Sequence, residues 1–273
     1  MAQLEDQFHD ILNKAKRGLN LSDHDLIKKT GLRETDIQSL CKGQLTDANH
    51  LKKMAQALSL DTESLLAIAQ DSWRPQPVHI EGLKQFQSAW GDMIVNAYLL
   101  HNQTTAIAFD TGSDAQPMLD FLTKYHLTLQ TIFITHTHGD HIFELDRIQE
   151  ATQAQAWVCE KENIAGVQTF ESGHHFFCDT WKIETLLTQG HSPGGTTYVV
   201  KDTKQPIAFV GDALFAGSMG SVSATHYQSA QENIRNKILT LSDTTILCPG
   251  HGPMTTVSEE KNHNPFFASF FKS

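Results

Sequence analysis

The sequence predicts an α/β fold in which a small all-α domain precedes a layered α/β domain. Residues 1–72 carry apolar residues at helical spacing, separated by residues that start and stop helices. Beyond them, short apolar runs alternate with helical segments. The segment between, DSWRPQPVHIEG, has two prolines and a glycine, which is typical of a linker. We therefore expect two domains, residues 1–72 and residues 73–273.

The first domain is expected to consist of short helices. Apolar residues recur at helical spacing between residues 4 and 15. The second helix is expected to run from a Ser22 cap to Gly31, and Asp61 is expected to cap the last helix. The remaining helices are predicted in residues 33–43, 49–60 and 61–70.

The second domain is expected to contain short strands with helices between some of them. The clearest helical segment is residues 116–125, QPMLDFLTKY. Such alternation favours a layered arrangement of helices on sheets. The predicted strands are residues 93–100, 105–109, 131–135, 156–159, 181–187, 198–200, 207–210 and 245–248.

Composition argues against several classes of protein. The 273 residues include 21 basic and 31 acidic side chains, and a net charge of −10 disfavours general affinity for nucleic acid or anionic membranes. The first twenty residues lack the apolar stretch of a secretory signal, and no other segment resembles a membrane span. Four widely spaced cysteines predict neither a disulfide framework nor a zinc knuckle. We expect a cytoplasmic protein without membrane association.

A cluster of ligand-type residues follows the predicted strand 131–135. If this strand is extended, His136 and His138 lie on one side and can reach one metal ion. Gly139 is expected to turn the backbone, so that Asp140 and His141 reach a second ion. Surface histidines without a common target are the alternative, but four ligand-type residues within six positions disfavour it.

Three further strands also end in a ligand-type residue beside a glycine. His191 follows Gly190, Asp212 follows Gly211, and His251 follows Gly250. Strand ends that converge on one site would bring all these side chains together. Nitrogen and oxygen donors suit zinc first, with iron or manganese as alternatives, and the lack of cysteine disfavours copper or an iron–sulfur cluster.

These motifs, HxHxDH at 136–141, GHSPGG, GDALFAGS and PGHGP, resemble those of the metallo-β-lactamase superfamily over roughly residues 78–265. The resemblance implies an αββα sandwich with two divalent metal ions between its sheets. It also implies the ligand set: His136, His138 and His191 for the first ion, Asp140, His141 and His251 for the second, and Asp212 bridging both.

Within the superfamily, the aspartate at position 212 and the complete HxHxDH motif resemble glyoxalase II-like hydrolases more than secreted β-lactamases. The resemblance implies that Asp110 in FDTG supports the ligands and that His226 and Tyr227 border the substrate pocket. Ser221 stands where relatives commonly carry arginine, and only a short segment follows the last motif. We therefore do not extend the resemblance to recognition of glutathione.

The implied activity is hydrolysis of a small-molecule thioester, lactone or activated ester by a metal-bound hydroxide. Asp140 and Asp212 would orient this nucleophile or take its proton. A persulfide dioxygenase with one iron ion is an alternative, although its last histidine usually lies in an AHD motif, whereas His251 lies in GHG.

Residues 15–70 resemble the repressor-like helix-turn-helix family. In this interpretation Thr35, Gln38, Ser39 and Lys42 would face DNA. Acidic residues near the start of the same helix would oppose phosphate, so we favour a helical bundle used for dimerisation or protein contact. The corresponding alternative function is a DNA-binding regulator that senses a ligand or metal with its second domain.

Overall fold

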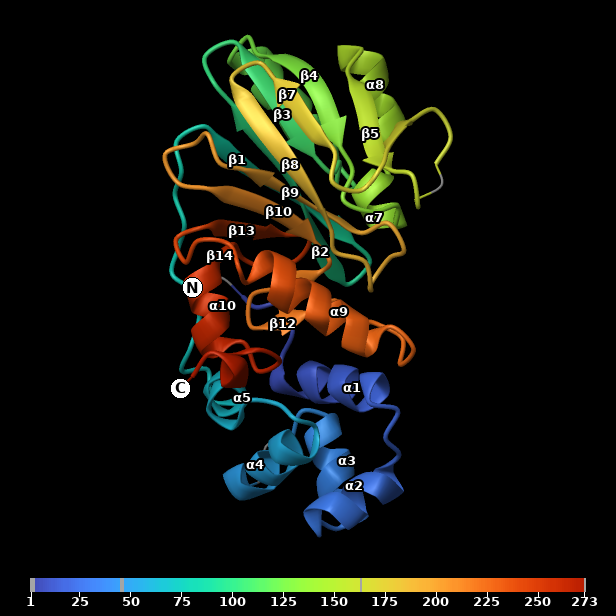
Figure 1. Ribbon diagram of the computed structural model, residues 1–273, viewed down its shortest axis with the longest axis vertical. Coiled ribbons are helices and arrows are strands. Elements are labelled where there is room, and N and C mark those ends of the chain that lie inside the picture. Colours follow the sequence, from blue (N-terminus) through green and yellow to red (C-terminus); the bar gives the residue numbers. More distant parts are fainter. Residues whose placement is uncertain (1–2, 45–46, 163, 273) are drawn as a thin grey trace.

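The computed structural model describes residues 3–44, 47–162 and 164–272. Two six-stranded sheets pack face to face, helices cover their outer faces, and a bundle of short helices lies at the lower end (Figure 1). The predicted fold class, an αββα sandwich with preceding helices, is confirmed. No described helix is long and apolar enough to cross a membrane.

The first sheet has the strand order β1-β2-β3-β4-β5-β6. Its first three strands pair antiparallel, and β3 to β6 pair parallel. The carboxyl ends of the parallel strands therefore meet at one edge. The bounds are β1 Leu83–Trp90, β2 Met93–His101, β3 Thr105–Phe109, β4 Thr128–Phe133, β5 Gln155–Cys159 and β6 Gln168–Phe170.

The second sheet has the order β14-β13-β10-β9-β8-β7, with β10 and β13 parallel and the other neighbours antiparallel. A separate hairpin, β11 with β12, follows β10. The bounds are β7 His175–Cys178, β8 Trp181–Leu187, β9 Thr196–Val200, β10 Ile207–Gly211, β11 Leu214–Phe215, β12 Ser218–Met219, β13 Ile246–Pro249 and β14 Thr255–Thr256.

The central strands β3, β9 and β10 are buried on both faces. Aromatic residues such as Phe109, Phe133 and Phe209 fill the space between the sheets. The helices α6 and α8 cover the outer face of the first sheet, and α9 and α10 cover that of the second. The bounds are α6 Gln116–Lys124, α7 Gly139–Ile142, α8 Leu145–Thr152, α9 Tyr227–Asn233, continued by a π-helix Ile234–Ile238, α10 Val257–His263, and a 3₁₀-helix Ala268–Phe270.

Five short helices form the N-terminal bundle. The expected caps are confirmed: Ser22 accepts a hydrogen bond from Asp25 N at 3.1 Å, and Asp61 accepts one from Ser64 N at 2.9 Å. Gly31 ends the second helix, also as predicted. The bounds are α1 Phe8–Gly18, α2 Asp23–Thr30, α3 Glu34–Cys41, α4 Ala48–Ala57 and α5 Thr62–Ala69.

This bundle shares its hydrophobic core with the rest of the chain. One continuous cluster contains Leu4 and Phe8 together with Tyr227, Phe266 and Phe267. Lys14 in α1 donates a hydrogen bond to the carbonyl oxygen of Met219 in β12 at 2.8 Å. The bundle is therefore packed against the hairpin that follows β10, as the adjacent ribbons in Figure 1 show.

Candidate metal centre

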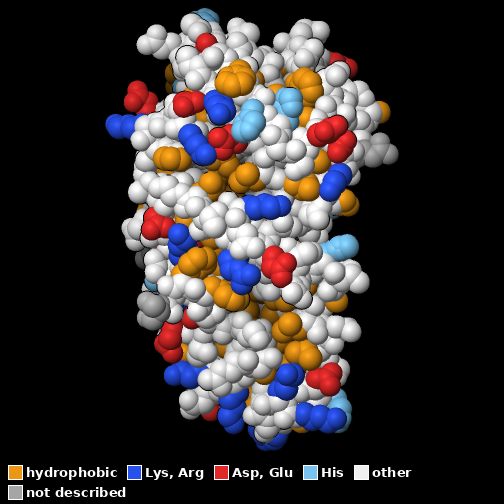
Figure 2. All heavy atoms as spheres, viewed as in Figure 1, with side chains coloured by type: hydrophobic (Ala, Val, Ile, Leu, Met, Phe, Trp, Pro, Cys, Tyr) orange, Lys and Arg blue, Asp and Glu red, His pale blue; other side chains and the backbone are white. Residues whose placement is uncertain are grey.

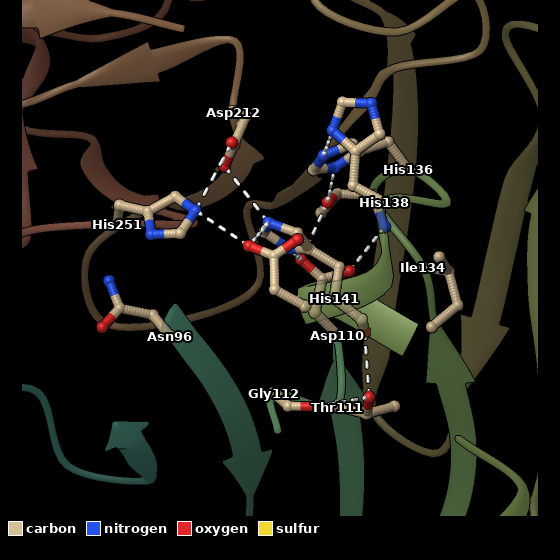
Figure 3. A network of polar contacts seen from close by, with 12 residues as sticks. Asn96, Asp110, Thr111, Gly112, Ile134, His136, His138, His141, Asp212 and His251 are labelled. Carbon is tan, nitrogen blue, oxygen red and sulfur yellow. Dashed lines mark hydrogen bonds and ion pairs between the residues drawn. The ribbon is translucent and has the colours of Figure 1, made fainter. Parts of the chain in front are cut away.

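Seven ligand-type side chains converge where strands of both sheets end, and Figure 3 labels His136, His138, His141, Asp212 and His251 among them. The loop after β4 and the short helix α7 carry four of them, the β8–β9 connection carries one, and β10 and β13 are each followed by one. The seven are His136, His138, Asp140, His141, His191, Asp212 and His251. The structure thus brings together every residue of the expected ligand set.

Three histidines form the first group. The Nε2 atom of His136 lies 3.0 Å from Nδ1 of His138, and Nε2 of His191 lies 2.9 Å from the same Nδ1 atom. One ligand atom from each of the three lies within 4.8 Å of the others. A single cation can therefore be reached by all three rings.

A second group has one carboxylate and two histidines. Oδ2 of Asp140 lies 3.1 Å from Nε2 of His251 and 3.5 Å from Nε2 of His141. Asp212 stands between the groups, because its oxygens lie 3.3 Å from Nε2 of His141 and 3.4 Å from Nε2 of His191. Its carboxylate is therefore within reach of ions in both groups.

The side chains fit divalent cations. Nε2 of His141 and Oδ1 of Asp212 are buried and lie 3.3 Å apart, yet neither forms a hydrogen bond, although buried polar atoms normally do. The backbone at Gly250 also approaches the centre closely, because an added Cβ there would lie 2.1 Å from Oδ1 of Asp212. Imidazole nitrogens and carboxylate oxygens suit zinc, iron or manganese.

The electrostatics of the centre favours bound cations. Burial opposes the ionised form of Asp212, but the neighbouring histidines outweigh it and hold the pKa of this carboxyl well below its usual value. Burial lowers the pKa of His136 well below its usual value, so this ring is neutral and offers a lone pair. Burial also disfavours charge on His251, yet Asp140 and Asp212 raise its pKa to about 10. The acidic half of the centre thus attracts positive charge.

Hydrogen bonds orient the candidate ligands. Oδ2 of Asp110 lies 2.8 Å from Nδ1 of His141, and Asp110 also accepts hydrogen bonds from N and Oγ1 of Thr135 at 2.7 and 2.8 Å. Nδ1 of His251 lies 2.8 Å from the carbonyl oxygen of Ile94. Partners of this kind fix the tautomer and direction of a ligand histidine.

The departure at Ser221 leaves this support intact. Its backbone carbonyl oxygen lies 2.9 Å from Nδ1 of His191, so no side chain is needed there. A backbone acceptor therefore fixes Nδ1 of His191, as acceptors also fix Nδ1 of His141 and His251.

The expectation that Gly139 turns the backbone through a conformation open only to glycine is wrong. This residue opens α7 without a left-handed backbone conformation. An added Cβ would instead lie 3.3 Å from Cζ2 of Trp90. The helical turn of α7 therefore directs Asp140 and His141 toward the centre, and the small residue allows the indole ring to pack closely.

Sequence reasoning missed several residues that hold the centre together. The hydroxyl of Tyr98 donates to the carbonyl oxygen of Pro249 at 2.8 Å, and that of Tyr198 to the carbonyl oxygen of Ile134 at 2.7 Å. Both bonds tie strand ends across the sheets. Tyrosine within an apolar strand was the available signal, because a buried hydroxyl requires a partner.

Of the two predicted substrate contacts, only His226 is exposed. Tyr227 is buried, and an added Cβ on Gly18 in α1 would lie 2.2 Å from its ring. The structure therefore does not support Tyr227 as a substrate contact, because its ring packs against the N-terminal bundle. His226 stays a prediction.

The residues predicted to face DNA lie on and just after α3. Thr35, Gln38 and Lys42 are exposed, and Ser39 is half-buried. Arg33 beside them forms a two-pronged contact with Asp36 at 2.9 Å. In Figure 2, acidic side chains lie among the basic ones at the lower end of the molecule. Binding to DNA stays a prediction.

The two-sheet fold and the candidate metal centre at the strand ends together define the class of protein. The chain belongs to the metallo-beta-lactamase superfamily, whose family model matches residues 90–251. It is 29% identical to the probable metallo-hydrolase YqgX of Bacillus subtilis, over 72% of this chain and 98% of that protein. It is 26% identical to the hydroxyacylglutathione hydrolase GloC of Haemophilus influenzae, over 62% of this chain and 90% of that protein.

A solved structure agrees with the fold. The BLEG-1 B3 metallo-beta-lactamase is 29% identical and superimposes with a TM-score of 0.59, over 70% of this chain and 100% of that one. The helical bundle before residue 73 lies outside the family match.

Proposed function

We propose that the protein is a dinuclear metal-dependent hydrolase. The observation that carries this proposal is the pair of ligand groups with Asp212 between them, in which Nε2 of His141 and Oδ1 of Asp212 are buried without forming hydrogen bonds. One ion would be held by His136, His138 and His191. The other would be held by Asp140, His141 and His251, with Asp212 shared. Zinc is the proposed metal, and iron or manganese suits the same donors.

The proposed substrates are thioesters, lactones and activated esters. Support for the thioester comes from the relative named as a hydroxyacylglutathione hydrolase. When bound, the two ions supply a water of lowered pKa and stabilise negative charge on the attacked carbonyl oxygen. Asp140 and Asp212 would accept hydrogen bonds from the attacking water and hold its proton during the attack.

We further propose that residues 1–72 and 73–273 are two domains that function as one packed unit. The shared cluster around Phe8 and Tyr227 supports this arrangement. Contact within the chain or with a second copy is then the main role of the bundle. A mobility-shift assay with genomic fragments at low salt tests the alternative, and sequence-specific retardation would favour a regulator instead.

The hydrolase proposal is tested by metal analysis and a substrate panel. The wild-type protein is expected to contain up to two zinc, iron or manganese ions per chain and to hydrolyse at least one thioester or lactone. Asp140→Ala should reduce the rate by about 100-fold or more, whereas Asp146→Ala, at an exposed aspartate in α8, should not. Equal rates for the wild type and Asp140→Ala would overturn the proposal. One iron per chain with oxygen uptake on a persulfide would favour the dioxygenase.

A further inference from the structure

Glu162 is a buried carboxylate outside the candidate ligand set. It lies in the turn that follows β5, where its backbone N–H donates to the carbonyl oxygen of Cys159 at 2.9 Å. Only 6% of its surface is exposed. A carboxylate is costly to bury unless donors surround it, so its contacts must account for its position.

The two oxygens of Glu162 bind two different loops. Oε2 accepts hydrogen bonds from the backbone N of Thr137 at 3.3 Å and from its hydroxyl. Oε1 accepts hydrogen bonds from the backbone N of Gly194 at 2.7 Å and from the hydroxyl of Ser192. Each loop thus supplies one amide and one hydroxyl donor.

These loops carry the three histidines of the first group. Thr137 lies between His136 and His138, and Ser192 directly follows His191. The first loop leaves β4 in one sheet, and the second joins β8 and β9 in the other. The same carboxylate therefore fixes the spacing between ligands that come from opposite sheets.

We infer that Glu162 is a positioning residue for the three-histidine metal site, holding the histidine loops of the two sheets at ligand spacing through its four hydrogen bonds. This inference rests on the proposed metal-binding function of His136, His138 and His191. Outer partners of metal ligands commonly affect metal affinity by about 10- to 100-fold when they are replaced.

Both oxygens of Glu162 must act as acceptors, because each of them faces a backbone N–H. A glutamine would place its NH₂ group against one of the loops. A hydroxyl there can rotate and accept, but the backbone N–H of Thr137 or Gly194 cannot. Close approach is required too: an added Cβ at Gly194 would lie 2.6 Å from Cγ of Glu162.

The test measures Co²⁺ binding to metal-free protein, followed by visible absorption. Glu162→Gln is compared with the wild type and with Glu160→Gln, a matched control two residues away whose side chain is exposed. Ser192→Ala removes one hydroxyl from the same carboxylate and serves if Glu162→Gln does not fold. Thermal unfolding of each metal-free protein is recorded alongside, because a purely structural role would lower stability without changing affinity or spectrum.

We expect Glu162→Gln to bind one of two Co²⁺ ions about 10- to 100-fold more weakly, with an altered absorption band, and Ser192→Ala to show a smaller change in the same direction. Glu160→Gln should match the wild type. Wild-type affinity and spectrum in both Glu162→Gln and Ser192→Ala would overturn the inference while leaving the metal centre standing. A wild-type protein that binds no Co²⁺, zinc, iron or manganese would overturn the proposed function itself.

Discussion

Glu260 in α10 should make stability depend on pH. It is fully buried, and its oxygens accept hydrogen bonds from Gly217 N at 3.0 Å, Asn264 Nδ2 at 2.7 Å and Thr255 Oγ1 at 2.8 Å. Burial nevertheless outweighs these donors and, with a small contribution from Glu259, raises the pKa of Glu260 from 4.5 to about 7.

The sign and size of the effect follow from this pKa. Between about pH 4.5 and pH 7 the folded protein keeps a proton that the unfolded chain releases, so the free energy of unfolding falls as pH rises. Each pKa unit corresponds to about 1.4 kcal/mol, so Glu260 lowers stability by about 3 kcal/mol across this range. Glu260→Gln removes the titrating group and should remove this part of the pH dependence.

The assay is urea unfolding of metal-free wild type and Glu260→Gln at pH 5 and pH 8, monitored by tryptophan fluorescence. Glu150→Gln, at an exposed position in α8, is the control for a glutamate that folding does not bury. Relative to Glu260→Gln, the wild type should lose about 3 kcal/mol between the two pH values. A stability difference that stays constant between pH 5 and pH 8 would refute the reasoning.

Three further predictions concern the metal centre and the interface between the domains. Asp110→Asn should weaken metal binding by about 10- to 100-fold, measured by zinc titration, because an amide cannot accept all three hydrogen bonds of this carboxylate. Gly250→Ala should abolish metal binding by Asp212, because the added Cβ would lie 2.1 Å from Oδ1 of this candidate ligand. A metal content per chain equal to that of the wild type would contradict this. Tyr227→Ala should lower the free energy of unfolding by about 3 kcal/mol by leaving a cavity against Gly18, with the metal content per folded chain unchanged.

Much of the fold was predictable because local patterns determine it. Residues only a few positions apart predict the caps at Ser22 and Asp61. Short apolar runs in the same way predict the fully buried strands β3 and β10. The edge strand β1 was missed, because its polar residues give no apolar run. Similar reasons apply to the two-residue strands of the β11–β12 hairpin, which are too short for any periodicity.

The candidate site also has one part that the sequence predicts and another that it does not. Ligand-type residues beside glycines at strand ends are visible in the sequence, and the structure gathers them. Glu162 was invisible, because it lies in the charged run EKEN, where a solvated carboxylate is the ordinary interpretation. The packing of Tyr227 on α1 was equally hidden, since helical periodicity shows which face is apolar but not what covers it.

The shared core also sets an order of events during synthesis. Leu4 and Phe8 belong to the same cluster as Phe266 and Phe267, and Asp61 N donates to the carbonyl oxygen of Pro265 at 2.7 Å. During synthesis, the apolar surface around Leu4 and Phe8 therefore stays partly uncovered until residues 265–267 have left the ribosome. A chain that ends between His251 and Phe266 should be aggregation-prone although it already contains every candidate metal ligand.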